Sequence, residues 1–165
     1  MAKESLKIIG INPGTRYLGI AVLYGQELMD WRIKVLGGKW SEGKKEKAIE
    51  IVSAFIARYE PNILAIKKLH PLRRTENLLR LSNWIKKFAR RRKISIFQYS
   101  IKEIERYFVE DQKLNKRNLI DAIMKLYPML HHDHKKEQTH KNPYYFRMFE
   151  AVALASACSQ RLGKS

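Results

Sequence analysis

Residues 6–20 read LKIIGINPGTRYLGI and predict the first strands of a β-sheet. The apolar run at residues 6–11 is closed by Asn12-Pro13-Gly14, which is typical of a strand that ends in a turn. Residues 17–24 and 28–36 are also rich in apolar and β-branched side chains, and each run stops at glycine. Short connections of this kind are typical of hairpins. We therefore expect the chain to open with three antiparallel strands.

After these strands the apolar residues change to helical spacing and then alternate with short apolar runs. The expected elements are, in order, a helix between the N-cap Ser41 and Pro61, a strand at 62–66, a helix at 78–88, a strand at 94–99, helices at 101–109 and 116–127, a polar loop at 130–143 and a last helix at 144–162.

This order of elements predicts an α/β layer fold. A helix between two strands favours parallel pairing, so the later strands should run parallel and the first three antiparallel in one mixed five-stranded sheet flanked by helices. The sequence contains no internal repeat and no linker. We expect residues 1–165 to form a single domain.

The composition points to an anionic partner. The chain has 33 Lys and Arg against 16 Asp and Glu, a formal net charge of +17. Nucleic acid is the first candidate and an anionic membrane surface the second. No apolar run approaches the ~18 residues of a membrane span. The N-terminus does not resemble a secretory signal, and Cys158 has no cysteine partner within the chain, so we expect a cytoplasmic protein.

Three segments of the sequence carry a family pattern: IIGINPG at residues 8–14 followed by Gly19, FIARYEPNILAIKK at 55–68 and FEAVALA at 149–155. Together they resemble the RuvC-type Holliday junction resolvases of the ribonuclease H-like superfamily. They occur in the family's order and spacing over nearly the whole chain. The resemblance implies a ribonuclease H-like fold and, because active relatives are homodimers, a two-fold dimer.

The resemblance also implies a site. In active members four carboxylates hold divalent metal ions, usually magnesium, which activate water during phosphodiester cleavage. Carried over position by position, those carboxylates correspond here to Asn12, Lys67, Arg147 and Glu150. Only Glu150 is acidic, and a hard dication needs several charged oxygen ligands. We therefore expect no catalytic magnesium, no other metal cofactor and no cleavage by the family mechanism.

Two interpretations of the altered positions remain open. Lys67 could pair with Glu150 and fill the space of the metals, which would preserve the fold. Alternatively, Lys67 and Arg147 could contact a phosphate group. The side chain of Asn12 is expected to cap its own turn. Three replacements at one site favour natural divergence over a laboratory substitution.

The charged residues at positions 69–93 are almost all cationic, with nine Lys or Arg against a single acid, Glu76. This pattern predicts an anion-binding surface and a single helical ion pair between Glu76 and Arg80. A weaker basic group follows after residue 112, where acids are interspersed. The candidate nucleic-acid contacts are His70, Arg73, Arg74, Arg80, Lys86, Lys87, Arg90 and Arg91, with Lys113, Lys116 and Arg117 in the second group.

Two other segments carry possible sites with simpler alternatives. The aromatic residues 144–146 could stack on bases, but aromatic side chains that open a helix are more often part of the core. Residues 131–134 read HHDH and are followed by His140, which suits zinc or nickel in composition. Their spacing matches no defined zinc motif, so a polar loop is the simpler interpretation.

Three functions are compatible with these observations. The first is a protein that binds branched or duplex DNA and does not cut it. The second is an active metal-dependent crossover junction endodeoxyribonuclease that uses magnesium, Glu150 and other nearby ligands. The third is a structural or RNA-associated role, because a basic surface alone does not distinguish DNA from RNA.

Overall fold

The computed structural model describes residues 6–110, 113–140 and 144–163. Its sheet has the strand order β3-β2-β1-β4-β5, with β1 antiparallel to β2, β2 antiparallel to β3, and β1–β4 and β4–β5 parallel. The expected mixed five-stranded sheet is thus confirmed. The strands are β1 (Lys7–Asn12), β2 (Tyr17–Tyr24), β3 (Glu27–Val35), β4 (Ile63–Lys67) and β5 (Ser95–Tyr99).

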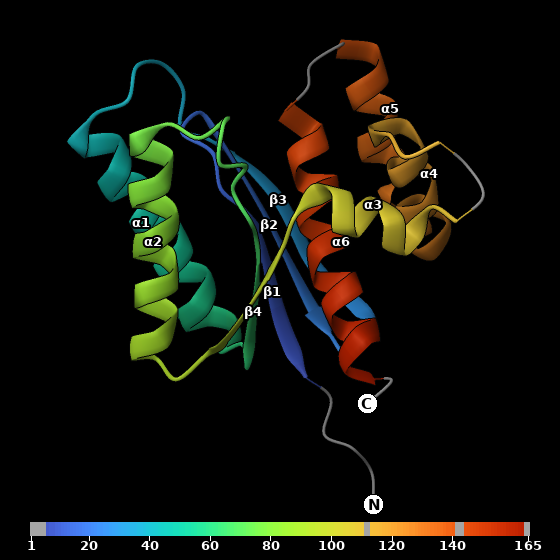
Figure 1. Ribbon diagram of the computed structural model, residues 1–165, viewed down its shortest axis with the longest axis horizontal. Coiled ribbons are helices and arrows are strands. Elements are labelled where there is room, and N and C mark those ends of the chain that lie inside the picture. Colours follow the sequence, from blue (N-terminus) through green and yellow to red (C-terminus); the bar gives the residue numbers. More distant parts are fainter. Residues whose placement is uncertain (1–5, 111–112, 141–143, 164–165) are drawn as a thin grey trace, which may run out of the picture.

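Helices cover both faces of the sheet (Figure 1). One face carries α1 (Glu42–Tyr59) and α2 (Glu76–Arg91), and the other carries α3 (Ile101–Phe108), α4 (Lys116–Leu126), the short 3₁₀ helix η1 (Pro128–Leu130), α5 (His131–His140) and α6 (Tyr144–Gly163). Two apolar cores result, because alternate residues of the buried strands point to opposite faces. Ile9 and Ile11 pack beneath α1 and α2, and Ile8 packs toward α6.

Glycine allows α6 to approach the sheet closely. A Cβ atom added to Gly10 would lie 2.3 Å from the carbonyl oxygen of Ala151, and one added to Gly19 would lie 2.3 Å from that of Arg147. No side chain fits at such distances. The start of α6 therefore rests directly on the backbone of β1 and β2.

Replacing Gly19 with alanine should destabilise the protein, because the new methyl group would push the Arg147 carbonyl and α6 off the sheet. We expect the free energy of unfolding, measured by chemical denaturation, to fall by about 1–3 kcal/mol. Gly43→Ala is the control, because its Cβ would meet nothing closer than 3.8 Å within α1. It should be neutral or stabilising. Equal losses in both variants would contradict the close approach.

Most predicted elements are confirmed with their ends shifted by one or two residues. Ser41 is the N-cap of α1 and accepts a hydrogen bond from the Lys44 amide. Among the described residues, no helix is both long and apolar enough to cross a membrane.

The loop predicted at residues 130–143 is wrong for most of its length, because residues 131–140 form α5. This helix is polar on all sides and so has no apolar stripe that a sequence pattern could reveal. It is attached by specific contacts instead. The Trp31 indole donates a hydrogen bond to Asp133 (3.0 Å), and the His134 ring lies edge-on to Phe149. The buried Leu130 anchors the turn that precedes it.

Candidate functional site

Asn12, Lys67, Arg147 and Glu150 lie together at one edge of the sheet. β1 and β4 are parallel neighbours, so their carboxyl ends, which carry Asn12 and Lys67, reach the same edge. Arg147 and Glu150 are three residues apart near the start of α6 and so share one side of that helix. The spatial convergence that the resemblance implied is therefore present.

The side chain of Asn12 is directed to α6. Its Nδ2 atom donates to Glu150 Oε1 (2.8 Å) and lies 3.5 Å from the Arg147 carbonyl oxygen. Asn12 is fully buried, and its Oδ1 atom has no hydrogen-bond partner within the described part of the chain. The expectation that Asn12 caps its own turn is wrong, because the nearby Glu150 carboxylate takes the amide.

Of the two interpretations left open by the sequence, the pairing of Lys67 with Glu150 is present in the structure. Lys67 Nζ lies 3.8 Å from Glu150 Oε2, with side chains that are 28% and 5% exposed. Burial raises the pKa of the Glu150 carboxyl above its usual value, and the nearby charges of Lys67, Lys116 and Arg147 offset part of this change. Burial likewise lowers the pKa of Lys67, against the opposing effect of Glu150. Each group thus depends on the other to remain charged.

Two further cations border this pair. The guanidinium of Arg147 lies over the turn after β1, where its NH1 atom is 3.4 Å from the Pro13 carbonyl oxygen. Lys116, the first residue of α4, places Nζ 4.6 Å from the centre of the Phe146 ring. Its charge lowers the pKa of both Lys67 and Glu150. Sequence reasoning assigned Lys116 to a separate basic group, and no local signal could have joined it to the site.

This arrangement does not fit the magnesium that the resemblance implies. The single carboxylate has both oxygens engaged, Oε1 by the amide of Asn12 and Oε2 by the ammonium of Lys67. Lys67 and Arg147 are cations, which repel a dication at short range. In the ranges that the structure describes, no three or more His, Cys, Asp or Glu side chains are grouped so that they could hold a metal ion.

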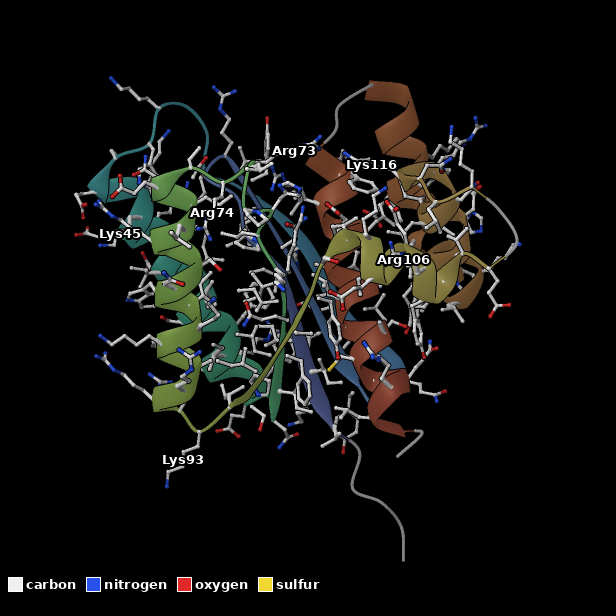
Figure 2. The ribbon with its side chains drawn as sticks, in the orientation of Figure 1. Lys45, Arg73, Arg74, Lys93, Arg106 and Lys116 are labelled. Carbon is white, nitrogen blue, oxygen red and sulfur yellow. The ribbon has the colours of Figure 1, made fainter. Side chains whose placement is uncertain are left out.

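The loop between β4 and α2 lies beside the site and is built to expose its side chains. The Lys68 amide donates to the Tyr99 carbonyl oxygen (2.8 Å), which attaches the start of the loop to β5. His70 then closes a tight turn, accepting from the Leu72 amide at Nδ1 (3.1 Å). Arg73 and Arg74 are exposed, and the Leu72 side chain is 90% exposed. Figure 2 shows Arg73 and Lys116 at the same end of the molecule.

The cations of α2 extend away from the site instead of surrounding it. α2 runs back to the start of β5, at the amino ends of the parallel strands, and Lys93 lies at the end of the molecule opposite Arg73 (Figure 2). Arg80 forms the predicted ion pair with Glu76 (2.7 Å). The Lys86 ammonium donates to Gln98, and burial lowers its pKa. The remaining candidates on this helix, Lys87, Arg90 and Arg91, are exposed.

The other candidate segments are placed as follows. Lys113 and Arg117 are exposed beside Lys116. Phe146 is buried, as expected for a core aromatic residue. The side chains of residues 136–140 and 144 lie outside the described part, so His140 and Tyr144 are not placed. In the HHDH segment, Asp133 and His134 face Trp31 and Phe149, as described above for α5.

No protein-family model matches this sequence, and no curated protein does. Similar solved structures include Thermus thermophilus RuvC, with a TM-score of 0.72 and 14% identity over 96% of this chain and 97% of that chain. The same protein in complex with Holliday junction substrate gives 0.71 and 15%, over 96% of each chain.

The yeast mitochondrial Holliday junction resolvase Ydc2 is also similar, with a TM-score of 0.67 and 10% identity over 99% of this chain and 82% of that chain. The strand order and these matches together show a ribonuclease H-like fold. At such low identity the likeness concerns the fold.

Proposed function

We propose that this protein binds nucleic acid, with branched or duplex DNA as the preferred form, and does not cleave it by a metal-dependent mechanism. The observation that carries the proposal is the Lys67–Glu150 ion pair, which occupies the position where the resemblance places metal ions. Exposed arginines and lysines around it supply the contacts that phosphate groups require. One structural relative was solved with Holliday junction substrate, which favours branched DNA as the first ligand to test.

The deciding experiment combines binding with cleavage. Labelled four-way junction, duplex and RNA of equal length are titrated with protein at several salt concentrations, then incubated with magnesium or manganese. We expect junction or duplex DNA to bind with a steep loss of affinity as salt rises, and to remain intact. Symmetric junction cleavage that Glu150→Gln abolishes would establish the alternative, an active endonuclease. Preferential binding of RNA would overturn the choice of DNA.

A homodimer remains a prediction of the resemblance. Light scattering coupled to size-exclusion chromatography, with and without junction DNA, would test it. A monomer in both samples would exclude this part of the proposal.

If the missing carboxylates are what prevents metal binding, restoring them should allow the site to bind magnesium or manganese. The triple substitution Asn12→Asp, Lys67→Glu, Arg147→Asp would surround Glu150 with oxygen ligands. Magnesium or manganese at saturating concentration should raise the melting temperature of this variant by about 5–10 °C, as expected for a ligand present at about 100 times its Kd. The unmodified protein should show no such rise. A rise in the unmodified protein that Glu150→Gln removes would contradict the proposal.

Leu72 should contribute to recognition of unpaired or unstacked bases, because its apolar side chain is 90% exposed between basic residues. We expect Leu72→Ser to reduce the preference for a four-way junction over duplex by about 5-fold, which corresponds to about 1 kcal/mol of apolar contact. Leu126→Ser, at a 47% exposed leucine of α4, is the matched control. If Leu72→Ser lowers the affinity for duplex as much as the affinity for the four-way junction, Leu72 does not contribute to the preference for the junction.

A further inference from the structure

A second cationic site lies on the other side of the molecule's sheet, away from α6. The edge strand β3 and the last turns of α1 line an open surface cavity of about 240 Å³. Asp30, Arg32 and Lys34 line it from one face of β3, because alternate residues of a strand share a face. Phe55, Arg58 and Tyr59 line it from α1.

The one acid of this cavity is fully engaged. Asp30 is nearly buried, accepts from Arg32 Nε at Oδ1 (3.0 Å) and accepts from the Tyr59 hydroxyl at Oδ2. Burial and the adjacent Asp30 raise the pKa of Tyr59, so the phenol keeps its proton as a donor. Asp30 therefore orients two neighbours and presents little free charge to the cavity.

The cations, by contrast, remain available. Arg32 is held at Nε, and its two terminal nitrogens make no other hydrogen bond to any described residue, while its side chain is 56% exposed. Lys34 and Arg58 form no ion pair with another described residue. The guanidinium of Arg58 lies 5.3 Å from the centre of the Tyr59 ring, which packs against Phe55. Three cations and one carboxylate, Asp30, thus line the cavity, and the ion pair of Asp30 with Arg32 leaves the terminal nitrogens of Arg32 exposed and the charges of Lys34 and Arg58 uncompensated by any lining residue.

Clustered like charges repel one another unless an anion joins them. A guanidinium anchored at Nε presents its terminal nitrogens as a fork that matches two oxygens of a phosphate.

We propose that this cavity binds a phosphate group, with Arg32 as the bidentate contact and Lys34 and Arg58 as supporting charges. Asp30 and Tyr59 are positioning residues that hold Arg32 in place. The phosphate belongs either to a free nucleotide or to a nucleic-acid backbone. The free-nucleotide form of the proposal is independent of the function proposed above.

The test uses the full chain and the double variant Arg32→Gln/Arg58→Gln, which removes the proposed bidentate contact and one supporting charge. Arg106→Gln/Lys125→Gln is the matched control, because it removes two exposed charges on α3 and α4, which cover the opposite face of the sheet (Figure 1). Calorimetry measures binding of pyrophosphate and of adenosine 5′-monophosphate, and fluorescence anisotropy measures binding of a labelled DNA duplex. Tyr59→Phe, which keeps the ring and removes the hydroxyl, should give a smaller loss in the same assays.

A loss of at least 10-fold in affinity for pyrophosphate or the nucleotide, seen in the double variant and absent in the control, supports a free-nucleotide site. The same loss confined to duplex DNA supports a backbone contact. Affinities that change by less than 2-fold for every probe overturn the proposal. They do so whether or not the protein binds DNA elsewhere, because the site formed by Asn12, Lys67, Arg147 and Glu150 is unaltered in these variants.

Discussion

Replacing Arg73, Arg74 and Lys116 with glutamine in one triple variant should weaken binding of a labelled DNA duplex by about 100-fold at low salt. Lys116 acts electrostatically on the Lys67–Glu150 pair, Arg73 and Arg74 lie in the loop that follows Lys67, and Arg73 and Lys116 lie at the same end of the molecule (Figure 2). The plot of log affinity against log salt has a negative slope, and each phosphate contact that is lost should reduce the magnitude of this slope by about 1. The triple variant should therefore have a slope whose magnitude is smaller by about 3.

The control removes the same charge from distant positions. Arg106→Gln, Lys125→Gln and Lys93→Gln replace exposed cations on α3, on α4 and in the turn after α2. This protein should keep its salt slope within about 1 and most of its affinity. Equal losses in the two triple variants would mean that net charge, and not the candidate site, governs binding.

Replacing Lys67 with methionine should leave Glu150 as a buried carboxylate without its cation. Glu150 is 5% exposed and is stabilised in its charged form by Lys67. We expect the free energy of unfolding at neutral pH to fall by about 2–4 kcal/mol, since removing one partner of a buried ion pair is strongly destabilising. Lys68→Met, at the exposed neighbouring lysine, should change it by less than about 0.5 kcal/mol.

Removing the charges of both Lys67 and Glu150 should restore most of the lost free energy of unfolding. In Lys67→Met/Glu150→Gln no buried charge remains, and the amide can still accept from Asn12. Additive losses in the double variant would show that the two side chains do not interact.

The loss of unfolding free energy in Lys67→Met should become larger as the pH rises. Burial raises the pKa of Glu150 in the folded state above its usual value near 4.5, and without Lys67 it should be raised further. At pH values just above 4.5, the Glu150 carboxyl of the folded variant therefore keeps its proton, whereas the same carboxyl in the unfolded chain has lost it. The deficit of the variant should therefore be small at pH 4 and grow toward neutral pH. A deficit that is constant over this range would exclude Glu150 as its cause.

Local patterns were sufficient to predict most of the fold. The strands at residues 6–11 and 17–24 and the helix after Ser41 follow from apolar periodicity, turn residues and caps, which act over a few neighbouring residues. The polar helix α5 escaped prediction, because its attachment depends on contacts such as Trp31–Asp133, whose partners lie far apart in the sequence.

The candidate site divides in the same way. The resemblance selected Asn12, Lys67, Arg147 and Glu150, and the structure brings them together. The resemblance could not show that Asn12 donates to Glu150 instead of capping its turn, because this hydrogen bond joins β1 to α6, which are far apart in the sequence. Nor could it separate the cations of the loop after β4 from those at the end of α2, since neighbours in sequence lie at opposite ends of a helix.

The sequence alone determined the order of strands and helices, the excess of positive charge and the presence of the basic residues Lys67 and Arg147 at positions where the resemblance implies acids. These depend on residue identity and short-range geometry. Only the tertiary structure decided how the charges are grouped: Lys116 beside Lys67, α2 leading away, and a separate cationic cavity between β3 and α1. The physical reason is that electrostatic interactions depend on distance in space and on burial, and both are set by how the sheet and its helices pack.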